Sequence, residues 1–291
     1  MPDLRTRIDW SERDKFDWTS EAGLEKLRTL VRPHLPFDPR PFQLEDSARI
    51  LNGQDIILTT ATGDGKSALI YIPALARKEM RTVVVEPTNA LESDIASGLR
   101  SKGVSCVAIN ADTLAAAKAA GRDLWKEARQ CIYQVVTTSP ESLRSVEFDT
   151  MIKDIHFNAR WGVLTIDEAH LVDDWGADFR KAYADIWMLR ARGPPHLSVV
   201  AMSATIEKGR QLDQITHCLG FQKGAYFFDH RDCERRNVDY VFREAQFHFS
   251  GHVFKDLDWL IPKNMKRPSD LDKGIIYCDT IELGHRVTLY L

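Results

Sequence analysis

The chain has 291 residues and a net charge of −3, with 44% hydrophobic and 28% charged residues. This composition is ordinary for a globular protein, and no apolar run approaches the length of a membrane span. The charge excludes a globally basic surface, so any nucleic-acid function needs a local site.

The N-terminal segment is polar and lacks the apolar core of a secretory signal, so we expect a protein that is neither secreted nor membrane-embedded. Its five cysteines are scattered and form no CxxC pair. This usage is typical of free thiols in a reducing compartment, and it argues against a cysteine-rich zinc site.

Residues 1–36 are expected to form a helical extension. Ser20 is a helix start signal, and Leu24, Leu27, Leu30 and Val31 follow at helical spacing. Two prolines end the pattern, so we predict one helix packed on the body of the protein.

From about residue 40, apolar strands alternate with helical stretches such as 66–80 and 90–103. The predicted strands are short and rich in Val, Ile and Leu, without alternation; they cover 55–60, 82–87, 106–110, 134–139, 162–167 and 197–204. Such runs suit parallel strands that are buried on both faces. The repeated units predict an α/β fold with a doubly wound parallel sheet over residues 37–225.

The regularity weakens after about residue 222. We interpret 228–247 as a linker and 261–274 as a loop, followed by a fresh buried strand at 274–280 and a helix at 281–291. One strand and one helix cannot bury a core, so residues 226–291 are expected to be a linker and the truncated start of a second domain.

A glycine-rich turn lies between a predicted strand and helix and contains Gly63, Gly65, Lys66 and Ser67. Glycines let backbone N–H groups surround phosphate oxygens, and the helix N-terminus adds a favourable dipole. Lys66 would reach the β- and γ-phosphates, while the Ser67 hydroxyl would bind Mg²⁺. Thr60 replaces the first glycine of the strict motif, yet the position after a buried strand favours this function over an ordinary turn.

Arg40 and Gln43 precede this loop. A glutamine amide donates and accepts hydrogen bonds together, which suits the edge of an adenine. A surface glutamine is the plain alternative, and the amide chemistry alone does not decide between the two.

Asp167 and Glu168 follow another predicted strand. Ligands of parallel sheets bind at the carboxyl ends of strands, so this pair can meet the phosphate loop in one crevice. Asp167 would hold Mg²⁺, and Glu168 would orient or deprotonate the attacking water. His170 could equally make a local hydrogen bond.

Ser203 and Thr205 follow the last strand of the predicted sheet. Thr205 could cap the next helix. Alternatively, the pair could form a polar hinge between the nucleotide crevice and a second site.

Trp175, Phe179 and Arg180 lie shortly after the acidic pair. A base stacked on an aromatic ring gains roughly 1–3 kcal/mol without regard to sequence, and the arginine could bind phosphate. The spacing of the two rings alone favours the alternative that they anchor the next helix in the core.

With these residues together, the chain from about Pro39 onward resembles superfamily 2 helicases of the Asp-Glu-Ala-His type, and among them the RecQ family. The resemblance rests on "PRPFQ", "TTATGDGKS", "VVTTSPESL", "IDEAHLVDDWGADFRKAY", "MSAT", "RRNVDY" and "GIIYCDT". It implies two RecA-like motor domains that use ATP and Mg²⁺, of which this chain would contain the first and the start of the second.

The resemblance also assigns roles. It implies that Arg40 and Gln43 form an adenine motif, and that residues from Thr62 through Asp64 to Ser67 form a phosphate loop. The catalytic residues it implies are Lys66, Asp167, Glu168 and His170. It further implies that DNA is contacted by Trp175, Phe179 and Arg180, and that ATP hydrolysis is coupled to DNA movement by Ser203 and Thr205. Asp64 departs from the glycine more usual in the family, which adds negative charge near the phosphates. The segment "EPTNALESDI" also departs from the family's pattern, so its contacts with DNA are not implied.

The function implied is an ATP-dependent DNA helicase that tracks single-stranded DNA from 3′ to 5′ and unwinds duplex DNA, in the nucleus of a eukaryote or otherwise in the cytoplasm. One rival is an RNA helicase of the same superfamily, which typically lacks the aromatic-rich loop. Another is a module that binds nucleotide and DNA without unwinding, because the family's later motifs, including its arginine finger, would lie beyond position 291.

Overall fold

The computed structural model describes residues 16–174, 186–234, 237–249, 251–261, 265, 267, 271 and 273–291. The chain divides into two compact units, residues 1–235 and 236–291. Within the described ranges, no helix is both long and apolar enough to cross a bilayer.

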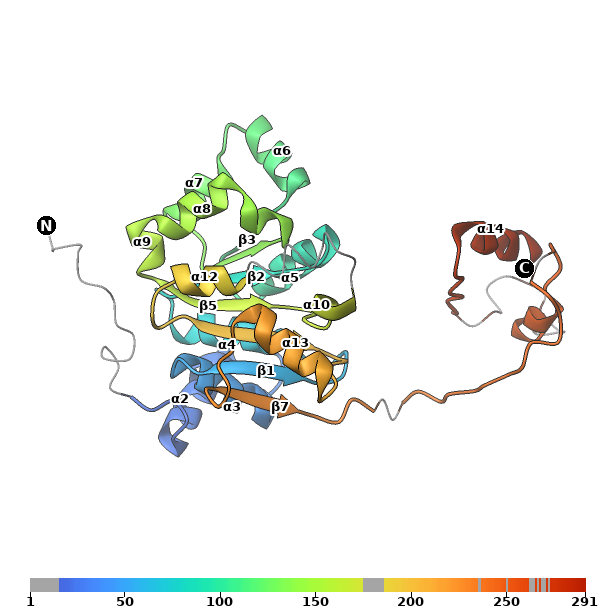
Figure 1. Ribbon diagram of the computed structural model, residues 1–291, viewed down its shortest axis with the longest axis horizontal. Helices are drawn as coiled ribbons and strands as arrows, with labels where there is room; N and C mark the ends of the chain where they lie inside the picture. The colour runs from blue at the N-terminus through green and yellow to red at the C-terminus, as the bar shows by residue number, and fades with distance from the viewer. Residues whose placement is uncertain are drawn as a thin grey trace, which may run out of the picture. The chain divides into compact units, whose positions relative to one another are not determined.

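The first unit is built on a seven-stranded sheet in which every neighbouring pair is parallel (Figure 1). Its strands are β1 (Asp55–Thr59), β2 (Arg81–Val85), β3 (Cys106–Ile109), β4 (Val135–Thr138), β5 (Trp161–Ile166), β6 (Ser198–Ser203) and β7 (Tyr226–His230), and their order is β3-β4-β2-β5-β6-β1-β7. The first six confirm the six predicted strands. Their apolar, β-branched side chains are buried because helices cover both faces of the sheet.

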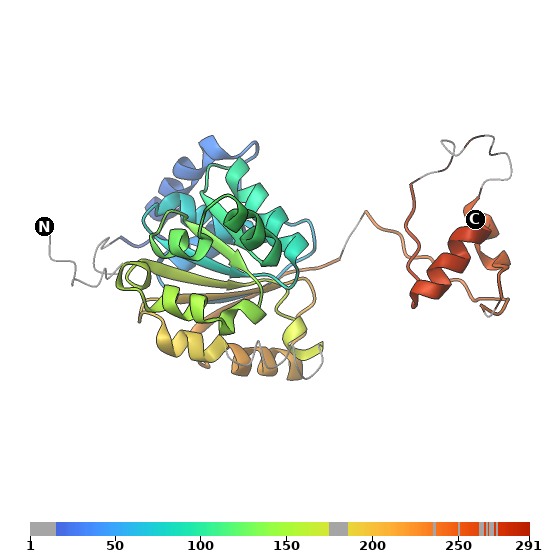
Figure 2. The same cartoon turned by 90° about the horizontal axis from the view of Figure 1, so that it is seen from above.

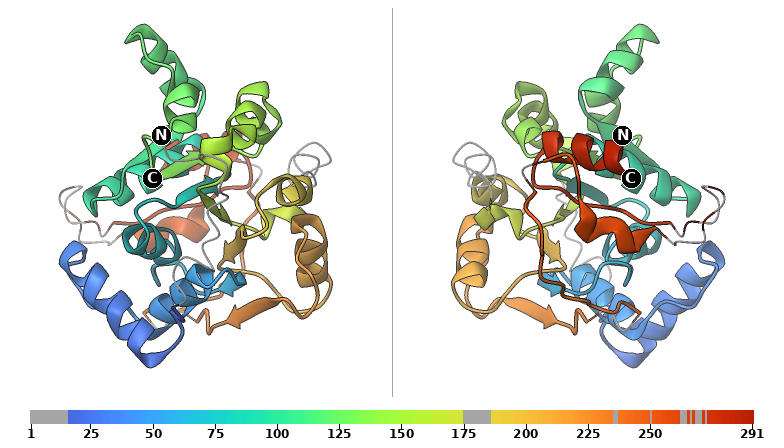
Figure 3. Two further views of the ribbon diagram at one scale, coloured as in Figure 1. Left: turned by 90° about the vertical axis from the view of Figure 1, so that its left-hand side faces the viewer. Right: turned by 90° about the vertical axis from the view of Figure 1, so that its right-hand side faces the viewer.

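Two layers of helices enclose this sheet (Figure 2). One layer contains α2 (Glu21–Val31), α3 (Pro41–Leu51), α4 (Ala68–Ala76) and α5 (Asn89–Ser101), whose apolar side chains share one core cluster. The other contains α7 (Leu124–Arg129), α8 (Val146–Lys153), α9 (Ile155–Asn158), α10 (Leu171–Asp174), α12 (Ile186–Arg192) and α13 (Arg210–Leu219). The end-on views in Figure 3 show α2, in blue, and α13, in orange, on opposite sides of the sheet. This arrangement confirms the predicted α/β fold.

The predicted N-terminal helix is present as α2 and continues into a 3-10 turn at Arg32–His34. Ser20 caps it, because its hydroxyl oxygen accepts a hydrogen bond from the Gly23 N–H at 3.1 Å. Leu27 and Val31 are fully buried in the same core cluster as α3 and α4. Each such side chain contributes about 1.5–3 kcal/mol through burial, so the extension is part of the first unit.

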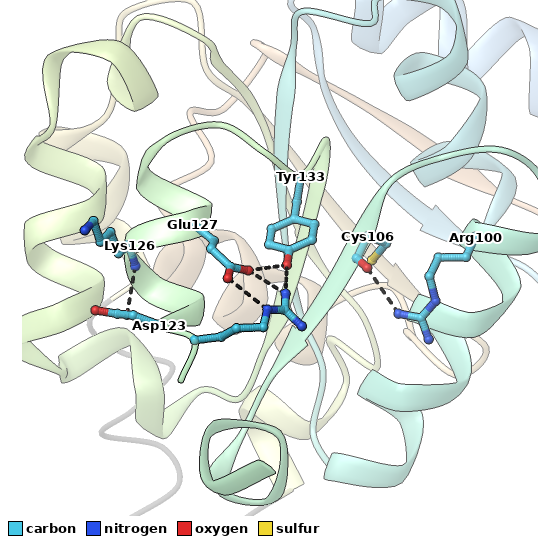
Figure 4. A network of polar contacts seen from close by, with 7 residues as sticks. Arg100, Cys106, Asp123, Lys126, Glu127 and Tyr133 are labelled. Carbon is cyan, nitrogen blue, oxygen red and sulfur yellow. Dashed lines mark hydrogen bonds and ion pairs between the residues drawn. The ribbon is translucent and has the colours of Figure 1, made fainter. Parts of the chain in front are cut away.

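A polar network joins α7 to the turn that precedes β4 (Figure 4). The Arg122 guanidinium donates to both carboxylate oxygens of Glu127, at 2.9 and 2.6 Å, and its Nη2 lies 2.7 Å from the Tyr133 hydroxyl. Beyond this network, α6 (Ala111–Ala119) follows β3 and packs Ala117 into the second core cluster. A 3-10 turn at Glu141–Arg144 connects β4 to α8.

Strand β7 lies where the sequence predicted a linker from residue 226. It pairs in parallel with β1, in a register that sets Tyr226 beside Asp55. The prediction was wrong here because an edge strand is only half buried and does not show the apolar run of a central strand. Arg49 of α3 further anchors β7, with its guanidinium carbon 4.0 Å from the centre of the Phe227 ring.

The second unit contains a 3-10 helix at Lys255–Leu260 and α14 (Ile281–Tyr290), which confirms the predicted C-terminal helix. Phe254 packs edge-on against Tyr290, with 5.7 Å between the ring centres. The predicted buried strand at 274–280 is not formed, and Ile275 and Tyr277 are 78% and 90% exposed. No strand among the described residues of this unit pairs with that segment, and an unpaired strand leaves its backbone groups to water.

Candidate active site

Three loops converge at the carboxyl ends of β1, β5 and β6. The Thr60 N–H donates to the Ser203 carbonyl at 3.1 Å, which extends the pairing of β1 with β6 by one residue. The Ala169 N–H likewise donates to the Met202 carbonyl at 2.9 Å. Because β6 lies between β1 and β5, these bonds bring the phosphate loop and the acidic pair to one crevice.

The phosphate loop is compact and depends on its glycines. Gly63 and Gly65 have φ values of +91° and +83°, which side chains with a Cβ adopt only under strain. A Cβ on Gly65 would also lie 2.6 Å from the amide nitrogen of Gln43. The loop then turns into α4, which begins one residue after Ser67.

Gln43 holds this loop through its side-chain amide. Its Oε1 accepts from the Arg40 N–H at 2.9 Å, while its Nε2 donates to the carbonyls of Asp64 and Gly65, both at 3.1 Å. Gln43 is only 3% exposed. Its predicted contact with adenine would therefore require the amide to exchange its bonds with the loop for bonds to the base.

Asp64 is also tied to its surroundings. It forms an ion pair with Arg40 and accepts a hydrogen bond from the Thr60 hydroxyl at 2.7 Å. The Thr60 hydroxyl, followed by the Arg40 guanidinium, lowers the pKa of the Asp64 carboxyl. The residue thus carries its negative charge at the mouth of the loop.

A chain of polar contacts runs from the phosphate loop to β6. Lys66 Nζ lies 3.8 Å from Glu168 Oε1, and His170 Nδ1 lies 3.2 Å from Glu168 Oε2. The same imidazole nitrogen is 2.7 Å from the hydroxyl of Ser203. Lys66, Glu168, His170 and Ser203, which sequence analysis selected separately, therefore lie in one connected group.

Glu168 occupies a strained position in this group. Its φ of +46° is in the left-handed region, which is uncommon for a residue with a side chain and costs on the order of 1–3 kcal/mol. The hydrogen bond from His170, and then the charge of Lys66, lower the pKa of the Glu168 carboxyl. The strained backbone thus holds an ionised carboxylate between a lysine and a histidine.

Asp167 stands beside a carboxylate that sequence analysis missed. The pairing of Val85 with Ile166 makes the next residues, Glu86 and Asp167, neighbours at the ends of β2 and β5. Glu86 is fully buried, and neither of its oxygens has a hydrogen-bond partner in the described part of the chain. Burial, and then the charges of Asp167 and Glu168, raise its pKa to about 9. The signal available from the sequence was a carboxylate directly after an apolar strand of the same sheet.

Burial also raises the pKa of Asp167, although the charge of Lys66 opposes this shift. Asp167 Oδ1 accepts a hydrogen bond from the Glu168 N–H at 2.9 Å, which fixes the direction of the carboxylate. The other carboxylate oxygen, Oδ2, takes no part in this bond.

The remaining predicted residues are less closely integrated. Thr62 is exposed on the loop. Thr205 is exposed too, and its N–H donates to the Ser203 hydroxyl at 3.1 Å. It does not cap a helix, since α13 begins at Arg210 with Gly209 as its N-cap. Trp175, Phe179 and Arg180 lie outside the described residues.

A family model described as DEAD/DEAH box helicase matches residues 40–214. The chain belongs to this family. The match spans the phosphate loop, the acidic pair and the β6 loop, which are the segments that the fold brings together. It confirms the membership that the sequence motifs predicted.

Proteins similar to this chain include DNA helicases of the RecQ type. The chain is 29% identical over 273 residues to the ATP-dependent DNA helicase Q-like 2 of Arabidopsis thaliana, covering 93% of this chain and 36% of that protein. It is 28% identical over 240 residues to the ATP-dependent DNA helicase RecQ of Haemophilus influenzae, covering 81% of this chain and 35% of that protein. RecQ-type helicases thus match most of the chain, while the chain spans about a third of the length of these relatives.

A solved structure supports the fold. The DUF1998 helicase MrfA, solved with DNA and AMPPNP, superposes with a TM-score of 0.55 at 18% identity, covering 75% of this chain and 30% of that one. At this identity the likeness concerns the fold, and it confirms a RecA-like helicase architecture for the first unit.

Proposed function

We propose that this chain is the nucleotide-binding motor unit of a RecQ-like DNA helicase, which hydrolyses ATP and couples hydrolysis to movement along single-stranded DNA. The observation that carries the proposal is the connected group Lys66–Glu168–His170–Ser203. It joins a phosphate-binding loop to a carboxylate and then to the end of a neighbouring strand. A structural salt bridge alone would not need the strained backbone of Glu168.

Binding of ATP would begin at the phosphate loop. Lys66 Nζ would exchange its contact with Glu168 for the β- and γ-phosphates, and the loop N–H groups would face phosphate oxygens. Arg40 and Gln43 stand at the same mouth of the loop, where the base would follow. Gln43 Nε2 donates to two carbonyls of the loop, so a contact between this amide and the base would replace at least one of these bonds.

The residues at the crevice suit Mg²⁺. Ser67 and Asp167 offer oxygen atoms, and Mg²⁺ usually takes one or two protein ligands and fills its octahedron with water and substrate phosphates. When bound, Mg²⁺ would supply charge neutralisation on the phosphates.

Glu168 would place the attacking water. Phosphoryl transfer has a loose transition state that needs little help from a base, so a carboxylate of lowered pKa can orient water without fully removing its proton. His170 would hold Glu168 in place. Because the same imidazole contacts Ser203, a movement of Glu168 would also move Ser203. This path offers a route from the nucleotide to residues that follow β6.

Steady-state ATP hydrolysis with and without single-stranded DNA tests the proposal. We expect wild type to hydrolyse ATP and Glu168→Gln to lose at least about 100-fold in rate while still binding a fluorescent ATP analogue. Single-stranded RNA of the same sequence serves as the matched control, and a DNA helicase should respond more strongly to DNA. Trp175→Ala should reduce stimulation by DNA without changing the basal rate.

Three results would contradict the proposal. Equal rates for wild type and Glu168→Gln would remove the hydrolytic role of the group. Binding of ATP and DNA without hydrolysis in any condition would favour the alternative module that lacks motor activity, and equal stimulation by RNA would favour an RNA helicase.

A further inference from the structure

A second cavity opens at the amino ends of the strands, the end of the sheet that lies opposite the nucleotide crevice. Its volume is about 640 Å³, within the range of roughly 300–1,000 Å³ that ligand sites occupy. It is lined by residues from the start of β2, the end of α7, the start of α9 and the residue before β5, including Arg81, Arg129, Cys131, Asp154, His156 and Arg160. The nucleotide crevice is at the carboxyl ends of the strands, so this cavity has no part in it.

The cavity has an excess of positive charge. Three arginines line it with a single carboxylate, Asp154. That carboxylate caps α9, because its Oδ1 accepts from the N–H groups of His156 at 2.9 Å and Phe157 at 3.2 Å. A local concentration of cations is notable in a chain whose net charge is −3.

Two of these arginines are joined through their backbones. The Arg81 N–H donates to the Arg160 carbonyl at 2.7 Å, which joins the start of β2 to the residue that precedes β5. Burial, and to a smaller degree the charge of Arg160, lower the pKa of the Arg81 guanidinium.

The simplest structural role of these arginines is to cap carbonyl groups. Arg81 donates to the carbonyls of Lys78 and Cys131, both at 2.9 Å, and Arg160 donates to that of His156 at 3.0 Å. Carbonyls fix the side chains but bring no countercharge. Within the described ranges no carboxylate forms an ion pair with any of the three arginines, and Arg81 Nε is buried without a hydrogen-bond partner.

Arg129 is not explained by capping, since no hydrogen bond or ion pair joins it to another described residue. We propose that this cavity binds a phosphate-bearing ligand, whose oxygens contact Arg129 and Arg160. Planar guanidinium groups match phosphate oxygens in pairs and are weakly hydrated, so they bind phosphate more specifically than lysines do. The ligand would also bring negative charge close to Arg81 and Arg160, which form no ion pair with a described carboxylate.

The test uses inorganic pyrophosphate as the probe and the 291-residue chain with Lys66→Ala, which removes the phosphate-loop lysine. We expect saturable binding by isothermal titration calorimetry, and we expect Arg129→Gln in this background to weaken it at least about tenfold. Lys118→Gln, an exposed residue of α6 with the same change in charge, is the matched control and should bind like the parent. Melting temperatures of all variants establish that each is folded.

Absence of saturable binding in the Lys66→Ala chain would overturn the proposal, as would equal affinities for Arg129→Gln and Lys118→Gln. A second arm, with the phosphate loop intact, identifies the source of the phosphate. If Arg129→Gln weakens binding of a fluorescent single-stranded oligonucleotide more than Lys118→Gln does, the ligand is nucleic acid. If only pyrophosphate binding is lost, the ligand is a free phosphorylated compound.

Discussion

Arg40 and Asp64 form an ion pair that joins the N-terminus of α3 to the phosphate loop. An aspartate on such a loop can point into water, where its charge is solvated. Asp64 instead is 25% exposed and bonded to both Arg40 and Thr60. Together with the amide of Gln43, this contact closes the loop against α3.

This relationship predicts that Asp64→Asn tightens ATP binding. Asparagine can keep a hydrogen bond to Thr60 but removes a negative charge from beside the phosphates, which is worth about 1 kcal/mol or about fivefold in affinity. Titration of a fluorescent ATP analogue measures the dissociation constant. Asp112→Asn, on the exposed side of α6, should leave it unchanged. Weaker binding by Asp64→Asn would mean that the aspartate helps to shape the loop for nucleotide.

The contact between His170 and Ser203 predicts a variant that hydrolyses ATP but responds poorly to DNA. Ser203→Ala removes the hydroxyl that lies 2.7 Å from the imidazole, while Lys66 and Glu168 stay in place. We expect a basal hydrolysis rate within about threefold of wild type, and a clearly smaller stimulation by single-stranded DNA.

Ser198→Ala is the matched control for that variant. Ser198 is equally buried at the other end of β6, where its hydroxyl donates to the Gln54 carbonyl at 2.6 Å. Each substitution removes one buried hydroxyl from the same strand, so we expect both to lower the free energy of unfolding by a similar amount. If single-stranded DNA stimulates ATP hydrolysis equally in the two variants, the contact between His170 and Ser203 does not couple the nucleotide crevice to DNA.

The environment of the Asp46 carboxyl leads us to predict that the free energy of unfolding falls as pH rises. Burial, and then the neighbouring carboxylate of Asp229, raise its pKa to about 7 from an ordinary 3.8. The folded chain therefore keeps a proton that the unfolded chain loses above about pH 4. The resulting stabilisation is fully present below about pH 4 and is lost as pH rises to about 7.

Asp46→Asn should therefore raise the melting temperature at pH 8 more than at pH 5. Each kcal/mol gained corresponds to about 2–4 °C for a unit of this size. Differential scanning calorimetry at the two pH values measures the effect, with exposed Asp94→Asn as the control. A gain that is equal at both pH values would show that Asp46 is already ionised in the folded chain.

Arg190 of α12, whose side chain is half-buried, and the buried Asp55 at the start of β1 form an ion pair that joins the second helical layer to the sheet. Asp55 is 3% exposed and also accepts a hydrogen bond from the Val199 N–H at 2.9 Å. Arg190→Ala would leave that carboxylate buried without its countercharge, at a cost of about 3–5 kcal/mol. Urea unfolding should report this loss, and Asp55→Asn in the same chain should recover part of it.

Arg28→Ala provides the comparison. Arg28 and Glu25 form an exposed pair on α2 with a separation of 3.9 Å, and such pairs contribute about 0–1 kcal/mol. Equal losses for Arg28→Ala and Arg190→Ala would mean that water reaches the Asp55 carboxylate.

Much of the first unit was predictable because its signals are local. Six apolar runs predicted six strands, and Gly63, Gly65 and Lys66 predicted a phosphate loop at the end of the first of them. The same reasoning failed for β7, whose half-exposed residues take their structure from pairing with β1. It failed also at 274–280, where an apolar run has no described strand beside it.

The sequence alone predicted a nucleotide site, since Lys66, Ser67, Asp167 and Glu168 follow strands in patterns that depend on near neighbours in the chain. Only the tertiary structure decided which groups meet. The register of β2 with β5 sets Glu86 beside Asp167, and the order β5-β6-β1 brings His170 to Ser203. Capping and turn chemistry act over a few residues, whereas these contacts join residues more than thirty positions apart and exist only once the sheet is formed.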